Sequence, residues 1–200
     1  RLFPQLELEV NGTFLDLLNP FALLMGLTTL LLFLTHGSVY LALKTTQEVR
    51  ERAQRLAVRL GPVALVVMAV AVVWQQFIRG TTGSVVLGAL AVVAMLAAVL
   101  LTRANRDGWA FLASAVSTGM LVTGWFASIY PDVFPSTINP DYSLNIENAA
   151  STPYTLTVMS WIALLFVPLI LGYQAWSYWI FRKRISTKQI PESPTSVPTH

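Results

Sequence analysis

The stretch FLTHGSVYLALKTTQEVRERAQRL, residues 33–56, changes abruptly from apolar to basic. Its apolar part contains a single histidine, His36, and its second part is rich in arginine. A helix that leaves a bilayer on the cytoplasmic side has this pattern, because lysine and arginine are enriched in cytoplasmic loops. The stretch therefore predicts a membrane-spanning helix followed by a cytoplasmic segment, and it raises the question of what His36 does.

The composition of the whole chain agrees with a membrane protein. Of its 200 residues, 54% are hydrophobic and only 12% are charged, whereas soluble domains have about 25% charged residues. So few charges leave too little polar surface to cover a water-soluble globule. The chain has no cysteine, which excludes disulfides, iron–sulfur clusters and thiolate chemistry from it.

Five stretches are long enough to cross a bilayer core of about 30 Å, which needs about 20 residues of helix. The first should begin with Asn19 as its N-cap and Pro20 at its first helical position. These stretches carry almost no charge, and they lack the polar face of a soluble core helix. The predicted fold class is all-α, a polytopic transmembrane bundle over residues 20–181 with spans at about 20–43, 57–78, 84–102, 109–130 and 154–181.

The lysine and arginine residues divide unequally between the two sides of this topology. Of the 13 in the chain, only Arg1 and Arg79 lie on the side with fewer positive charges. By the positive-inside rule, residues 1–19 and the loop 131–153 should face outward, and the basic tail 182–200 should be cytoplasmic. The composition of this tail also predicts disorder. Because the chain does not begin with methionine, we expect it to be a segment of a longer protein.

Three further residues are structural or interface candidates. Thr45 and Glu48 have the spacing of a capping box, so a helix is predicted to begin in the cytosol at Thr45 and to run into the second span. Pro168 lies inside the fifth span and should bend it, because proline removes a backbone hydrogen bond and clashes with the preceding turn.

His36 has several possible roles. The only other histidine, His200, lies in the tail, and no cluster of potential ligands has metal-site spacing. The interpretation we favour is a neutral imidazole that forms a hydrogen bond across a helix interface. A contact with a proton path or a quinone, and a haem ligand, are the alternatives. No glycine-rich loop follows a strand, so the sequence gives no support for nucleotide binding.

Long stretches of the chain resemble a known family. They are LLNPFALLMGLTTLLLFLTHGSVYLALKTTQEVRERA (17–53), RDGWAFLASAVSTGMLVTGWFASIYPDVFPSTINPDYSLNIENAASTPYTLTVMSW (106–161) and YQAWSYWIFRKRI (173–185). They are similar to the second half of subunit II of cytochrome bd-type quinol oxidases. His36 matches a histidine–glycine motif of that family, but the resemblance assigns it no role. The first four helices of the family, with their acidic residues, have no counterpart here.

The resemblance implies a fold of nine helices and a place in the plasma membrane of a bacterium. It implies a partner, subunit I, that holds two haems b and one haem d, so this chain should ligate no cofactor and contain no catalytic or metal-binding residue. The complex should oxidise quinol and reduce oxygen to water, which builds a proton gradient. This subunit should support the haem subunit and help shape routes for protons and oxygen. Small accessory subunits and a bound quinone are further possibilities; nucleic acid is not an expected partner.

Two other classes stay open at this stage. One is half of a membrane transporter or permease, although transporters often have paired broken helices around a midplane site, and only the fifth span has a proline well inside it. The other is a self-sufficient cytochrome with one haem held by His36 and a methionine. The absence of haem absorbance from the purified chain would dismiss the second class.

Overall fold

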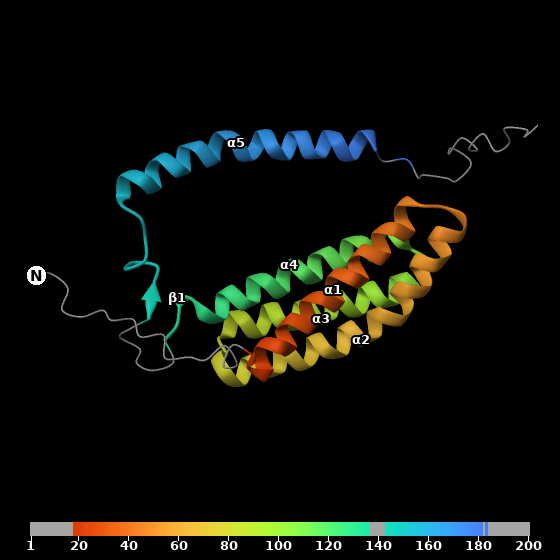
Figure 1. Cartoon of the computed structure of the whole chain (residues 1–200), viewed down its shortest axis with the longest axis horizontal. Coiled ribbons are helices and arrows are strands. Elements are labelled where there is room, and N and C mark those ends of the chain that lie inside the picture. Colours follow the sequence, from red (N-terminus) through yellow and green to blue (C-terminus); the bar gives the residue numbers. More distant parts are fainter. Residues whose placement is uncertain (1–17, 137–142, 182, 184–200) are drawn as a thin grey trace, which may run out of the picture.

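The computed structural model describes residues 18–136, 143–181 and 183, and most of these are helical (Figure 1). A short antiparallel ladder, β1 (Asp132–Phe134) with β2 (Leu144–Asn145), precedes the last helix. All five helices are long and apolar enough to cross a membrane, which confirms the all-α polytopic fold. They are α1 (Pro20–Lys44), α2 (Gln47–Arg79), α3 (Thr82–Arg103), α4 (Asp107–Ile129) and α5 (Pro153–Ile180).

Local sequence signals determine several helix ends. The side chain of Asn19 accepts a hydrogen bond of 2.8 Å from the backbone N–H of Phe21, and Pro20 opens α1, so the predicted N-cap is confirmed. A reciprocal capping box of Thr81 and Ser84 begins α3. As predicted, the basic segment and the second span form one continuous helix, α2, of 33 residues. Pro62 lies inside this helix, so the expectation that only the fifth span has an interior proline is wrong.

The predicted capping box at Thr45 is wrong. Helix α2 begins at Gln47 with Thr46 at the N-cap position, and it has no side-chain capping bond. Thr45 is instead the C-cap of α1, and its backbone N–H and its hydroxyl both donate to the carbonyl oxygen of Leu41 one turn earlier, the hydroxyl at 2.6 Å. Glu48 pairs with Arg52 on the exposed face of α2.

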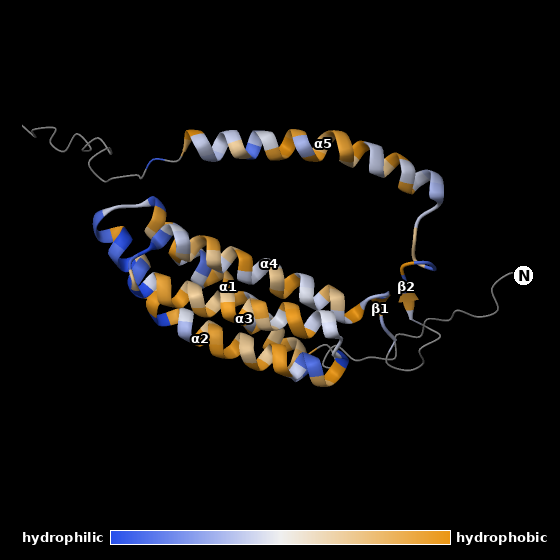
Figure 2. Ribbon diagram, turned by 180° about the vertical axis from the view of Figure 1, so that it is seen from behind, coloured by the Kyte–Doolittle hydropathy of each residue, from blue (hydrophilic) through white to orange (hydrophobic). Residues whose placement is uncertain are grey.

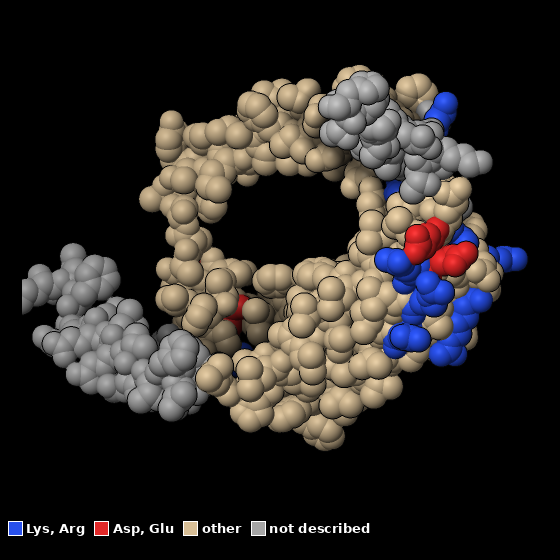
Figure 3. Space-filling model, turned by 45° about the vertical axis from the view of Figure 1, so that its right-hand side comes forward, with Lys and Arg blue, Asp and Glu red and all other residues tan. Residues whose placement is uncertain are grey.

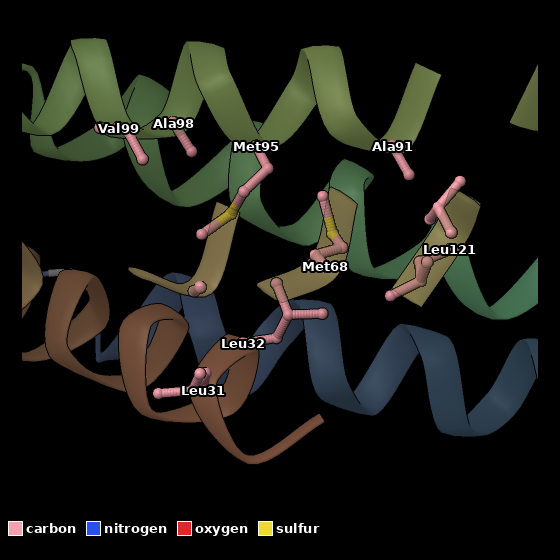
Figure 4. Close-up of a cluster of buried hydrophobic side chains, with 10 residues drawn as sticks. Leu31, Leu32, Met68, Ala91, Met95, Ala98, Val99 and Leu121 are labelled. Carbon is pink, nitrogen blue, oxygen red and sulfur yellow. The ribbon is translucent and has the colours of Figure 1, made fainter. Parts of the chain in front are cut away.

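Helices α1 to α4 pack as a bundle with a narrow core. Figure 4 shows Met68 of α2 and Met95 of α3 in the middle, with Leu32 of α1 and Leu121 of α4 beside them. Small residues let the backbones approach, as is common between membrane helices. A Cβ atom added to Gly88 would lie 2.7 Å from Cγ1 of Val72, so α2 and α3 are in close contact there.

Helix α5 stands away from this bundle (Figure 1). None of its residues is buried, and the space-filling view shows an open window between it and the bundle (Figure 3). At its far end, the carbonyl oxygen of Phe181 accepts a hydrogen bond of 3.0 Å from Nζ of Lys44. The helix continues through Pro168 as a single, gently curved element (Figure 1).

The two ends of the bundle differ in charge. Hydrophilic residues gather at the end where α1 connects to α2 (Figure 2), and Figure 3 shows lysine and arginine side chains concentrated there. The predicted N-terminal segment 1–19, apart from Leu18 and Asn19, lies outside the described residues, as does the tail 182–200, apart from Lys183. The described part of the predicted loop 131–153 contains β1 and β2.

Candidate functional site

His36 lies on α1 where that helix meets α4. Its Nδ1 is 2.7 Å from Oγ of Ser114, and the same hydroxyl is 2.9 Å from the carbonyl oxygen of Phe111. A serine hydroxyl has one proton to donate. Whenever Ser114 donates to the carbonyl oxygen of Phe111, Nδ1 of His36 must therefore donate to Ser114, and Nε2 is then the unprotonated nitrogen of the neutral ring.

Aromatic contacts fix the plane of the imidazole. The rings of His36 and Phe111 stack with their centroids 4.6 Å apart, and Tyr40, one turn further along α1, contacts the same phenyl ring at 5.7 Å. Ser114 is buried, whereas His36 is half-buried. The ring is thus oriented by one hydrogen bond and one stacking contact, and part of it stays exposed.

This geometry can hold a neutral histidine and can pass a proton between Nδ1 and a hydroxyl. Within residues 18–136, 143–181 and 183, no group of three or more His, Cys, Asp and Glu side chains could hold a metal ion. His36 is also the one histidine in that part of the chain. The hydrogen bond across the α1–α4 interface is the arrangement that the sequence favoured, while the role of His36 in the working protein stays a prediction.

A polar cluster at the basic end holds the extension of α2 in place. The Arg50 guanidinium donates to Oδ2 of Asp107 at 2.8 Å, and the carboxylate is only 5% exposed. Beside it, the Gln54 amide donates to the carbonyl oxygen of Thr102 and to the side chain of Asn105. The cluster thus ties the first turns of α2 to the connection between α3 and α4.

Sequence reasoning missed this cluster. The available signal was Asp107 at the first position of α4, because an acidic residue is favoured at the positive end of the helix dipole. Nothing in the spacing of the arginines distinguishes Arg50, which is paired and partly buried, from Arg55, for which no ion pair is found in the described part of the chain.

The remaining candidates, Thr45, Glu48 and Pro168, are not part of the cluster around His36. Thr45 and Glu48 belong to the connection between α1 and α2 and to the exposed start of α2, as described above. Pro168 lies in α5, which has no buried residue. The structure therefore does not bring the four sequence-predicted candidates into one site.

The sequence matches the family model described as cytochrome bd terminal oxidase subunit II over residues 3–181. It is 32% identical to cytochrome bd ubiquinol oxidase subunit 2 of Bacillus subtilis (strain 168) over 188 residues, which cover 92% of this chain and 56% of that relative. Identity to cytochrome bd-I ubiquinol oxidase subunit 2 of Escherichia coli (strain K12) is 30% over 228 residues, which cover 96% and 60% respectively. A probable cytochrome oxidase subunit 2 of Haemophilus influenzae is 32% identical over 205 residues, which cover 86% of this chain and 54% of that relative. The chain therefore spans little more than half the length of these curated relatives.

Proposed function

This chain belongs to the cytochrome bd terminal oxidase subunit II family. From that membership we propose that it is a subunit of a quinol oxidase, and that it is the subunit without haem. The complex oxidises quinol, reduces oxygen to water and builds a proton gradient. This subunit supports the haem-bearing subunit and helps shape the routes for protons and oxygen. The family match favours this function over the alternative, in which the chain would be one half of a membrane transporter.

The observation that carries the proposal is the position of α5. Helices in a membrane associate through close van der Waals packing and hydrogen bonds, because lipid gives apolar surfaces no hydrophobic reason to meet. The four helices of the bundle pack in this way, but α5 has no buried residue and faces an open window (Figure 3). A haem-bearing subunit that packs against α5 would supply the contacts that this part of the chain does not.

The haem groups belong to the partner in this proposal. A bis-histidine haem needs two imidazoles on opposite sides of the iron, and His36 is the one histidine among the described residues. Its Nδ1 is engaged by Ser114 and one face of its ring by Phe111. These residues do not fit a haem site, so we place the two haems b and the haem d in the partner subunit and assign no cofactor ligand to this chain.

The charge distribution supports a bacterial plasma membrane protein with its basic end inside. Lysine and arginine gather at the α1–α2 end of the bundle (Figure 3), which by the positive-inside rule is cytoplasmic. Because the chain has no cysteine, single cysteines can report the topology. A Glu147→Cys variant should react with an impermeant maleimide in intact cells, and Glu51→Cys should react only after permeabilisation; the reverse pattern would invert the topology.

The oxidase proposal is tested by mild detergent extraction through a C-terminal tag, followed by a reduced-minus-oxidised spectrum. We expect a membrane partner to co-purify with haem d absorbance near the red end of the spectrum. A colourless single polypeptide that persists under still milder extraction would contradict the proposal and return the transporter class to consideration.

A further inference from the structure

Two arginines on one face of α2 have no ion pair. Arg55 and Arg59 are one helical turn apart, and both side chains are exposed. In the described part of the chain no carboxylate pairs with either of them, whereas Arg50 and Arg52 each have an acidic partner. The positive-inside rule accounts for arginines at this end of the bundle, but it does not require that two of them lie unpaired on the same face.

The length of α2 places these two arginines at the depth of the lipid headgroups. No charged residue lies between Arg59 and Arg79, and at 1.5 Å per residue the two are about 30 Å apart along the helix. This distance is the thickness of the hydrocarbon core, and the headgroups add about 5 to 7 Å on each side. Arg59 therefore lies at the boundary of the core, and Arg55 lies about 6 Å further out, within the headgroup layer.

Arg55 and Arg59 line an open hollow on the surface of the helix. Its volume is about 340 Å³, and Gln54, Val58 and Glu51 also line it. Glu51 is one turn beyond Arg55 on the water side, about 12 Å from the level of Arg59. Its carboxylate therefore opposes a bound anion only at the outer edge of the headgroup layer.

Further positive charge lies beside this hollow. Gln54 donates to the carbonyl oxygen of Thr102 and to the side chain of Asn105, and each of these two residues precedes an exposed arginine, Arg103 and Arg106 respectively. Within the part of the chain that the structure describes, neither arginine has an ion pair. The hollow is thus in a region of positive potential, which attracts a ligand with net negative charge.

Towards the middle of the membrane, the same face of α2 is apolar and exposed. Val63, Val66 and Val70 follow Arg59 at helical spacing, and their exposed fractions are 50%, 62% and 50%. Half the thickness of the hydrocarbon core corresponds to about ten residues of helix, so these valines cover the leaflet next to the hollow. A molecule with an anionic head and an acyl chain matches both parts of this face.

The position of α2 favours lipid over a second protein as the occupant. Figures 1 and 2 show α2 on the side of the bundle opposite α5. A haem-bearing subunit that packs against α5 would leave the face of α2 to the bilayer. This step rests on the function proposed above; the charge and the depth of the two arginines do not.

We propose that Arg55 and Arg59 bind the headgroup of one anionic phospholipid, whose acyl chains lie along the exposed valines of α2. A guanidinium recognises phosphate by charge-assisted hydrogen bonds, and basic residues next to a membrane helix attract anionic lipids. In a zwitterionic phospholipid the ammonium group offsets the phosphate charge. The site should therefore distinguish lipids by their net charge.

The test measures lipid binding to the protein as it is purified, together with any partner subunit. The delipidated sample is titrated with phosphatidylglycerol or with the zwitterionic phosphatidylcholine, and native mass spectrometry counts the lipids bound. The wild type should bind one phosphatidylglycerol more tightly than the others and more tightly than phosphatidylcholine. Arg55→Gln and Arg59→Gln should each weaken this binding about fivefold, which corresponds to about 1 kcal/mol per basic residue, and the double variant about thirtyfold.

Two matched variants separate the site from a general effect of charge. Arg52→Gln removes the same charge from the same end of α2, but Arg52 is already paired with Glu48, so binding should weaken less than about twofold. Glu51→Gln removes the carboxylate from the hollow and should strengthen binding by up to about fivefold. A variant that acted only by disturbing the fold would not strengthen binding.

Three results would overturn the proposal. One is equal affinity of the wild type for phosphatidylglycerol and phosphatidylcholine. Another is an equal loss of binding in Arg52→Gln and Arg55→Gln, since overall charge and not the hollow would then be the cause. The last is a double variant that keeps its lipid and loses a partner polypeptide, which would make this face a protein interface. A haem spectrum of the same sample tests the oxidase function separately, so that failure of one proposal is distinguished from failure of the other.

Discussion

The bundle and α5 have similar apolar sequences, yet they pack in opposite ways. Every helix of the bundle buries a stripe of residues, and in α3 that stripe is mostly small, with Gly88, Ala91 and Ala98 in it. Helix α5 is rich in bulky aromatic residues, among them Trp161 and Trp176, and it buries none of them. Apolar character therefore predicts that a helix crosses the membrane, but the placement of small residues decides which helices pack within the chain.

The largest effect should come from filling a contact in the bundle. We expect Gly88→Leu to prevent proper folding or to lower the free energy of unfolding by about 3 kcal/mol, because the new Cβ would lie 2.7 Å from Val72 and overpacking is destabilising. The measurement is the yield of monodisperse protein and its thermal midpoint.

A glycine in α5 provides the matched control. A Cβ at Gly172 would meet nothing within 4 Å, so Gly172→Leu should leave the thermal midpoint of the isolated chain unchanged. If α5 docks on a haem-bearing partner, this variant should instead reduce the amount of partner that co-purifies. Equal destabilisation of the isolated chain by the two variants would end the distinction between the bundle and α5.

The next effect concerns the polar cluster at the basic end. Asp107→Ala should lower the free energy of unfolding by about 3 kcal/mol, because it leaves Arg50 without its partly buried partner. Glu48→Gln is the control, since the pair of Glu48 with Arg52 is exposed on both sides and should contribute less than about 0.5 kcal/mol. Denaturant titration of both variants measures the loss in free energy of unfolding. Similar losses in the two variants would mean that the burial of Asp107 contributes nothing to stability.

Much of the bundle was predictable, because length and hydropathy determine the spans and Asn19 with Pro20 marks the start of α1. The sequence also indicated that His36 could bond across a helix interface, but it could not identify Ser114, which lies 78 positions away. The capping prediction at Thr45 failed because a threonine hydroxyl can also bond back to the preceding turn, and here the bond to Leu41 wins. The separation of α5 could not be predicted, since hydropathy is the same whether a helix faces lipid, its own chain or a partner.

A smaller effect is expected at the interface of α1 and α4. His36→Gln should leave oxygen consumption by the complex near the wild-type rate, with at most a loss of yield, because an amide can replace the imidazole as a donor to Ser114. Oxygen electrode rates, normalised to haem content, check this expectation. A large fall in turnover with normal assembly would contradict a packing role and make His36 a participant in proton or quinone chemistry.

The smallest effect should come from the contact between the bundle and the far end of α5. Lys44→Gln removes the exposed hydrogen bond from Nζ to the carbonyl oxygen of Phe181, and an exposed contact of this kind should contribute under about 0.5 kcal/mol. The thermal midpoint of the complex should therefore fall by less than about 2 °C. Lys44→Arg, which retains the charge, serves as the control. A fall of more than about 4 °C in Lys44→Gln alone would mean that this bond, rather than a partner subunit, holds α5 in position.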